Sequence, residues 1–174
     1  MKEVIVKQIA ELKGRRTTME ILEVKAENRT YNREIVHRPQ ASVAIIKVFG
    51  TKAFILIKQF RTAIQKTIIE AVAGVVDDGE TPLKAIYREV EEETGYKVEY
   101  CTRLYSVYVS PGYSDEIIHA FYVEVNPNAG EQSLDDTERV SIAHFSEEEI
   151  DQYLSEGIVD GKTILAWQAY KLNK

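Results

Sequence analysis

Residues 74–96 read GVVDDGETPLKAIYREVEEETGY, a stretch that predicts a helix between two glycine-containing turns. Thr81 is a residue type favoured at the N-cap, and Pro82 is favoured at the first helical position. Gly95 is the residue type that commonly ends a helix, because glycine adopts the left-handed conformation without steric cost. The sequence therefore predicts a helix that spans residues 82–94.

The predicted helix has two distinct faces. Apolar side chains recur at i, i+3, i+4 and i+7 and predict an inward stripe of Leu83, Ile86, Tyr87 and Val90. Glu89, Glu92 and Glu93 share a second face, because residues three and four apart are neighbours on a helix. Glu91 lies away from them and should be solvated, and Arg88 can reach Glu92 one turn later. The spacing therefore predicts a group of converging carboxylates.

Carboxylates this close together repel one another, and a bound cation would remove the repulsion. Like charges at this spacing destabilise an isolated helix by a few tenths of a kcal/mol, and a hard cation such as Mg²⁺ removes that repulsion. Mg²⁺ usually binds one or two protein carboxylates together with substrate phosphates. A glutamate-rich helix is in most proteins only a solvated face. Here, however, Glu80, Arg88 and flanking glycines accompany the carboxylates, so we predict a divalent-metal site that acts on a diphosphate.

Length and composition are those of an ordinary soluble globular domain. The chain has 174 residues, of which 44% are hydrophobic and 29% charged, enough for one domain with a substantial core. Its net charge of -6 gives no general attraction to nucleic acid or anionic membranes, so neither is expected as a partner. Cys101 is the single cysteine, which excludes an internal disulfide. No signal-peptide pattern is present, and a cytoplasmic location is expected.

Segments outside the predicted helix favour strands. Residues 1–40 contain short apolar runs between polar turns and should form a small N-terminal antiparallel sheet. Residues 42–48 and 53–59 are typical of a buried hairpin. Further strands are expected at residues 67–73, 97–109 and 117–125, and further helices at 146–154 and 160–172. The expected fold class is α/β, with a mixed sheet between helical layers in a second domain, residues 41–174.

The chain resembles the Nudix hydrolases, which cleave nucleoside diphosphates linked to another moiety. The matching positions of the Nudix box are Gly74, Glu80, Arg88, Glu89, Val90, Glu92, Glu93, Gly95 and Tyr96. The resemblance implies an α/β/α sandwich and Mg²⁺, with Mn²⁺ as an alternative. By the same resemblance Glu89 and Glu93 would be the principal metal ligands. Glu92 and the Ala73 carbonyl would be further ligands, and Glu80 would support the loop.

Segments outside the box are similar to the ADP-ribose pyrophosphatase branch of the family. This similarity rests on residues 58–61, on residues 70–74 and on Pro111, which lies fifteen residues after the box. Val72 departs from the pattern, because many relatives carry proline at this position. The substrate-binding candidates are Arg61, Glu70, Ser110, Pro111, Gly112, Asp115 and Glu116. The arginine could clamp phosphate through its planar fork, and the proline turn could shape a ribose pocket. Each also fits an ordinary surface arginine or a solvated loop between strands.

A carboxylate on a flexible loop could deprotonate the attacking water, whose pKa a metal lowers. Residues 130–138 read GEQSLDDTE, and the catalytic glutamate of the ADP-ribose branch lies in the corresponding region. Glu138 is therefore the first candidate base and Asp136 the second, with Glu92 also in the catalytic set. Charged loops of this kind are often functionally idle. No triad-like or metal-ligand pattern includes the histidines His37, His119 and His144.

These features predict Mg²⁺-dependent hydrolysis of ADP-ribose to AMP and ribose 5-phosphate, or of a related nucleoside diphosphate sugar. The alternative is a Nudix hydrolase of another nucleotide sugar such as GDP-mannose. A non-catalytic nucleotide-sugar sensor is a further alternative, which the intact carboxylates disfavour. Members of this branch are commonly homodimers whose N-terminal strands help build the neighbouring subunit's nucleotide pocket. Residues 1–40 fit that arrangement, so we expect a homodimer, in which Tyr31 could stack on the base or lie in a core.

Overall fold

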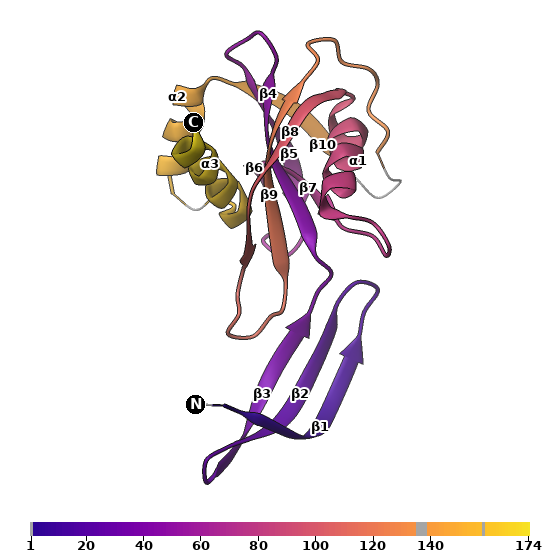
Figure 1. Ribbon diagram of the computed structural model, residues 1–174, viewed down its shortest axis with the longest axis vertical. Coiled ribbons are helices and arrows are strands. Elements are labelled where there is room, and N and C mark those ends of the chain that lie inside the picture. The colour runs from indigo at the N-terminus through magenta and orange to yellow at the C-terminus, as the bar shows by residue number, and fades with distance from the viewer. Residues whose placement is uncertain (1, 135–138, 158) are drawn as a thin grey trace. The chain divides into compact units, whose positions relative to one another are not determined.

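The computed structural model describes residues 2–134, 139–157 and 159–174. The chain divides into two compact units (Figure 1). The first unit comprises Met1–Gln40 and Val107–Ile118, and the second comprises Ala41–Ser106 and His119–Lys174. No helix among the described residues is long and apolar enough to cross a membrane.

The first unit contains a three-stranded antiparallel sheet in the order β1–β2–β3. Its strands are β1 (Val4–Lys13), β2 (Thr18–Ala26) and β3 (Arg29–His37). A tight turn at Glu27, which has a φ of 54°, joins β2 to β3. β1 is exposed along its whole length, including the large apolar side chains of Val4, Ile5, Val6, Ile9 and Leu12. The expected N-terminal antiparallel sheet is confirmed.

The second unit is built on a seven-stranded sheet. Its strands are β4 (Ala41–Val48), β5 (Phe54–Arg61), β6 (Lys66–Glu70), β7 (Val72–Val75), β8 (Val98–Tyr108), β9 (Ile117–Val125) and β10 (Val140–Phe145). The order is β10–β5–β4–β9–β8, with β6 beside β5 and β7 beside β4. β5 runs antiparallel to β4 and β10. β4 and β9 run parallel, because their C-terminal ends meet where the Phe49 N–H donates to the Val125 carbonyl at 2.9 Å. The sheet therefore contains both parallel and antiparallel pairs.

The strand predictions need two corrections. Residues 67–73, expected as one strand, form β6 and β7, which pair with different neighbours. The break falls at Ala71, whose N–H donates to the Thr163 hydroxyl at 2.8 Å instead of to a strand. β10 was not expected. It pairs antiparallel with β5 and forms one edge of the sheet. The hairpin of β4 and β5 is confirmed by the antiparallel pair Ile46 and Ile55.

Helices cover both faces of this sheet (Figure 1). They are α1 (Pro82–Thr94), α2 (Glu147–Ser155) and α3 (Gly161–Asn173). α1 packs Ile86 and Val90 into the main hydrophobic cluster on one face. α2 and α3 lie on the other face, where the rings of Trp167 and Phe54 meet edge to face with centroids 5.1 Å apart. The expected α/β/α sandwich is confirmed, with α1 alone on its side.

Candidate active site

α1 begins and ends where its sequence predicts. The Thr81 hydroxyl accepts a hydrogen bond from the Lys84 N–H at 3.3 Å, which caps the first turn. Gly95 has a φ of 69°, and its N–H donates to the Glu91 carbonyl at 2.8 Å. These local caps fix where the helix starts and stops, and therefore which turn carries each carboxylate.

The rotation of α1 differs from the predicted apolar stripe. Its buried residues are Ala85, Ile86, Glu89, Val90, Glu93 and Thr94. Leu83 and Tyr87, which were expected to point inward, are 47% and 42% exposed. Glu89 and Glu93 turn toward the sheet instead and keep only 7% and 2% of their surface. Glu91 is exposed, as expected. Two acidic side chains therefore line the inner edge of the helix rather than its solvent face.

Glu89 fits there only because residue 74 is glycine. A Cβ atom at Gly74 would lie 1.8 Å from both the Cδ and the Oε1 of Glu89, far inside van der Waals contact. β7 cannot easily retreat, because Gly74 is paired with Ser42 on β4. The peptide bond before Gly74 carries the Ala73 carbonyl, the predicted backbone ligand. The structure thus brings Glu89 against the strand that holds this carbonyl.

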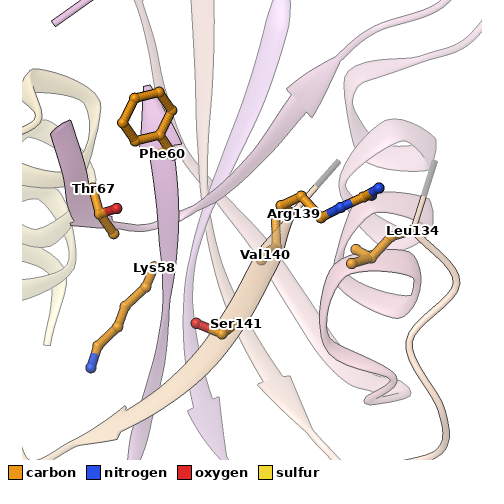
Figure 2. A pocket seen from close by; sticks show the side chains of 7 residues that line it. All are labelled: Lys58, Phe60, Thr67, Leu134, Arg139, Val140 and Ser141. Atoms are coloured by element: carbon orange, nitrogen blue, oxygen red, sulfur yellow. The ribbon is translucent and has the colours of Figure 1, made fainter. Parts of the chain in front are cut away.

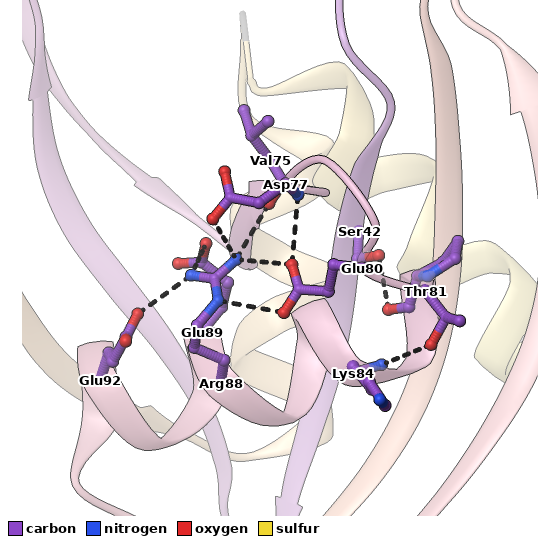
Figure 3. A network of polar contacts seen from close by, with 10 residues as sticks. Ser42, Val75, Asp77, Glu80, Thr81, Lys84, Arg88, Glu89 and Glu92 are labelled. Atoms are coloured by element: carbon purple, nitrogen blue, oxygen red, sulfur yellow. Dashed lines mark hydrogen bonds and ion pairs between the residues drawn. The ribbon is translucent and has the colours of Figure 1, made fainter.

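Arg88 links the carboxylates to the loop that precedes the helix (Figure 3). Its Nη1 donates to Glu89 at 2.6 Å and to Glu92 at 3.1 Å, as expected for the second of these. Its Nε and Nη2 donate to the two oxygens of Glu80 at 3.2 and 3.1 Å, and Nη2 also reaches the Val75 carbonyl at 3.0 Å. The hydrogen bonds to Arg88 hold the pKa of the Glu80 carboxyl below its usual value. Arg88 therefore sets the positions of Glu89 and Glu92 with one rigid guanidinium.

A segment of residues 130–133 is tied to the C-terminal end of α1. The Gly130 N–H donates to the Gly95 carbonyl at 2.7 Å, and the Ser133 N–H donates to the Glu92 carbonyl at 2.9 Å. Beside this segment lies a cleft of about 430 Å³ whose lining includes Arg88, Glu92 and Glu131. The sequence offered no signal for Glu131 beyond its charge. The base candidates Asp136 and Glu138 lie outside the described residues.

Arg61 and Glu70, which were predicted as separate substrate-binding residues, form an ion pair with each other. Arg61 donates from Nε and Nη2 to the two Glu70 oxygens at 2.7 and 2.9 Å. Burial lowers the pKa of Arg61, but the hydrogen bonds to Glu70 and the charges of Glu70, Asp160 and Glu93 outweigh it and raise the pKa. The Glu70 side chain has no exposed surface, so it reaches a ligand only through Arg61. Arg61 itself is 40% exposed, so its guanidinium remains accessible to a ligand.

The remaining predicted substrate residues belong to the first unit. The turn at Ser110, Pro111 and Gly112 is closed by the Tyr113 N–H, which donates to the Ser110 carbonyl at 3.1 Å. The Tyr113 carbonyl accepts in turn from the Val36 N–H of β3 at 2.7 Å. The structure therefore anchors this turn on the N-terminal sheet.

Asp115 and Glu116, which follow the turn, are engaged by β3 and the residue after it. Asp115 lies 2.6 Å from His37 Nδ1, and Glu116 pairs with Arg38 at 3.0 Å. The other ring nitrogen of His37 lies 2.9 Å from Glu20, and the hydrogen bonds to Asp115 and Glu20 raise the His37 pKa. Both of these substrate-binding candidates thus have protein partners within their own unit.

The donor set around Glu89 suits a hard divalent cation. Among the described residues, no three His, Cys, Asp or Glu side chains form a ready-made metal cage. Mg²⁺ does not need one, since it retains waters and binds substrate phosphates through one or two carboxylates. Glu89 and Glu93, with the Ala73 carbonyl nearby, provide oxygen donors of this kind. The residues therefore fit the metal that the carboxylate spacing predicts.

A second cleft, of about 460 Å³, opens beside β5 (Figure 2). Its lining is Lys58, Phe60, Thr67, Leu134, Arg139, Val140 and Ser141. Side chains alternate along a strand, so Lys58 and Phe60 project from the face of β5 opposite to Ile57 and Arg61. Ile57 packs in the same cluster as Ile86 of α1. Lys58 and Phe60 therefore point away from the α1 carboxylates, whereas Leu134 and Val140 of the same lining pack with the cluster that contains Ile86.

Comparison with known proteins finds several relatives of similar sequence. The chain is 37% identical over 144 residues to the ADP-ribose pyrophosphatase of Bacillus subtilis, with 82% of this chain and 77% of that protein covered. It is 35% identical over 164 residues to the methanol dehydrogenase activator of Bacillus methanolicus (92% and 88% covered). It is 31% identical over 151 residues to the GDP-mannose pyrophosphatase of Cronobacter sakazakii (82% and 78% covered).

Fold similarity extends over nearly the whole chain. The crystal structure of an ADP compounds hydrolase matches with a TM-score of 0.81 at 20% sequence identity, covering 98% of this chain and 93% of that one. A family model described as the NUDIX domain matches residues 38–168, a range that contains α1, β7 and Arg61. The chain therefore belongs to the NUDIX domain family, whose box is the carboxylate helix and its two flanking loops.

Proposed function

We propose that this protein is a cytoplasmic, homodimeric enzyme that hydrolyses the diphosphate bond of ADP-ribose, or of a related nucleoside diphosphate sugar, with Mg²⁺. One observation carries the proposal: Glu89 and Glu93 are buried against the sheet, and the partly exposed Arg61 guanidinium is fixed by two hydrogen bonds to the buried Glu70. Two carboxylates for a cation and one guanidinium for phosphate oxygens suit a metal-bound diphosphate. The relative named ADP-ribose pyrophosphatase supports this choice of substrate.

Each residue has a distinct task in this reaction. Glu89, Glu93 and the Ala73 carbonyl would hold the cation, with Glu92 as a further ligand that Arg88 keeps in place. When bound, the cation neutralises phosphate charge and lowers the pKa of water. Arg61 orients the diphosphate. For ADP-ribose, attack of water on one phosphorus gives AMP and ribose 5-phosphate.

The water also needs a base, for which we propose Glu138 first and Asp136 second. Support comes from the segment of residues 130–133, whose backbone is bonded to the end of α1 next to Glu92 and Gly95. Residues 130–133, which precede both candidates in the sequence, therefore lie beside the C-terminal end of α1. Ser110, Pro111, Gly112, Asp115 and Glu116 remain candidates for binding the substrate, with the proline turn shaping a ribose pocket.

A substrate panel tests the proposed specificity. We expect the kcat/KM for ADP-ribose with Mg²⁺ to exceed that for GDP-mannose, NADH and a nucleoside triphosphate by at least about tenfold, a ratio that a few polar contacts can supply. Steady-state assays that detect AMP, or the corresponding nucleotide, give each value. Equal or faster turnover of GDP-mannose would favour the alternative that the Cronobacter relative suggests. Failure with all of them would contradict the enzyme assignment.

The homodimer has its own support in β1. Val4, Ile5, Val6 and Leu12 expose between 52% and 68% of their surface on this edge strand, which large apolar side chains rarely do without a partner. We expect light scattering to give a mass of twice the 19.9 kDa of one chain. Ile5→Asp, which charges the same surface, should shift the protein toward the monomer. A wild-type protein that stays monomeric at micromolar concentration would contradict the proposal.

A further inference from the structure

A cluster of four charged side chains lies where β6 ends and α3 begins. Its members are Arg61, Glu70, Asp160 and Lys162. The fully buried Glu70 carboxylate is gripped from two sides, by the Arg61 fork at 2.7 and 2.9 Å and by the ammonium of Lys162 on Oε2. Lys162 is only 15% exposed and also pairs with Asp160 at 3.0 Å. The proposed reaction gives tasks to Arg61 but none to Lys162.

The first turn of α3 fixes this cluster in place. Asp160 caps the helix by accepting from the Thr163 N–H at 2.9 Å and from the Thr163 hydroxyl at 2.6 Å. That hydroxyl oxygen accepts the Ala71 N–H at 2.8 Å. One helical turn therefore holds the side chain of residue 70 and the backbone of residue 71, two positions before the Ala73 carbonyl.

The charges of the cluster balance only with Lys162 present. Arg61 and Lys162 contribute two positive charges, and Glu70 and Asp160 contribute two negative charges. Loss of Lys162 would leave one net negative charge beside a site that has to accept a diphosphate. Glu70 would then rely on Arg61 alone, and a buried carboxylate with one partner holds that partner more tightly. The Arg61 Nη1, which could donate a hydrogen bond to a phosphate oxygen, would then be displaced from the ligand.

We propose that Lys162 is a positioning residue, whose ammonium secures Glu70 so that Glu70 presents Arg61 to the diphosphate. Lys162 itself touches no substrate. The inference rests on the proposed function, because it assigns Arg61 to the phosphates. The proposal makes the first turn of α3, which is distant from β5 in sequence, a support for the binding site.

Lys162→Met removes the charge and keeps the side-chain length. We expect it to raise the KM for ADP-ribose about tenfold and to change kcat less than about threefold, since positioning of Arg61 acts mainly on binding. Lys162→Arg restores the charge and should bring KM back to within about threefold of the wild type. Lys171→Met, on the same helix and in ion pairs with Glu147 and Asp151, is the matched control and should leave both constants unchanged.

A double-mutant cycle separates positioning from general stability. In an Arg61→Gln background, Lys162→Met should change kcat/KM by less than about twofold, because the residue through which it acts is gone. An undiminished tenfold loss in that background, or a Lys162→Met variant that behaves like Lys171→Met, would overturn the proposal. Thermal melting checks that each variant folds, and Lys162→Gln replaces Lys162→Met if the latter does not.

The outcome can be told apart from a failure of the proposed substrate. Binding of inorganic pyrophosphate in the presence of Mg²⁺, measured by calorimetry, needs no turnover. If the wild type does not hydrolyse ADP-ribose but Lys162→Met weakens pyrophosphate binding about tenfold, the substrate is wrong and the positioning role stands. If ADP-ribose is hydrolysed and the variant binds pyrophosphate like the wild type, the positioning role fails alone.

Discussion

Glu93→Gln is expected to lower kcat for ADP-ribose hydrolysis by about a thousandfold or more, because it removes a charged ligand from the proposed metal site. Glu93 keeps 2% of its surface exposed in the last turn of α1, so a glutamine of equal size fits the same space. A neutral amide, however, supplies a much weaker oxygen donor to Mg²⁺ than a carboxylate does. Steady-state assays over a range of Mg²⁺ concentrations measure both the rate and the metal requirement.

The fold should survive this substitution. Glu89 and Glu93 are buried four residues apart on one helix, and loss of one of two like charges relieves repulsion between them. We therefore expect the free energy of unfolding without metal to stay within about 1 kcal/mol of the wild type. Glu91→Gln on the exposed face is the control and should keep full activity. Hydrolysis within tenfold of the wild type in Glu93→Gln would contradict the metal assignment.

The base and the metal ligands can be distinguished by the same assay. Glu138→Gln should lower kcat by about a hundredfold, in the range of general-base catalysis. It should leave the Mg²⁺ concentration for half-maximal rate unchanged, whereas Glu93→Gln should raise it. A shift of the Mg²⁺ dependence in Glu138→Gln would instead make residue 138 a metal ligand.

Features set by local chemistry were predictable from the sequence. The ends of α1 follow from Thr81 and Gly95, and α2 begins with the capping box that the sequence at Ser146 contains. The Arg88–Glu92 contact follows from helical spacing alone. The rotation of α1 was only partly predictable, because Leu83 and Tyr87 satisfy the period but find no neighbour to cover them. The periodicity of apolar residues identifies an apolar stripe on the helix. Which side of that stripe is buried depends on how the helix packs against the sheet.

Features set by distant residues were not predictable. Residues 67–73 have strand-forming character throughout, yet the Thr163 hydroxyl, 92 positions later, takes the Ala71 N–H and divides the strand. Glu70 was a substrate candidate by resemblance, and its buried carboxylate is paired with Lys162, which also lies 92 positions later. Long-range pairs between polar groups leave no periodic trace in a sequence. The carboxylate helix could thus be derived, but the support behind Arg61 could not.

Gly74→Ala is expected to reduce kcat/KM by about a hundredfold, an effect as large as the one expected for Glu138→Gln. The added methyl group would lie 1.8 Å from the carboxylate of Glu89, so either the side chain or β7 has to move. β7 is held by its pairing of Ala73 with Val43 and of Gly74 with Ser42. The Glu89 carboxylate should therefore be displaced from the Ala73 carbonyl, and the metal site loses its geometry. We expect a cost in unfolding free energy of about 1–3 kcal/mol from the overpacking, measured by urea denaturation.

A rescue experiment separates displacement of Glu89 from general damage. Glu89→Ala removes all three side-chain atoms, Cγ, Cδ and Oε1, that the new methyl group would meet. The double variant Gly74→Ala/Glu89→Ala should therefore be more stable than Gly74→Ala alone, a non-additive result, although it lacks the Glu89 carboxylate and stays inactive. Gly161→Ala, where an added Cβ meets nothing within 4 Å, is a control for stability alone and should not destabilise the fold. Activity of Gly74→Ala within about threefold of the wild type would mean that Glu89 does not act from its place against β7.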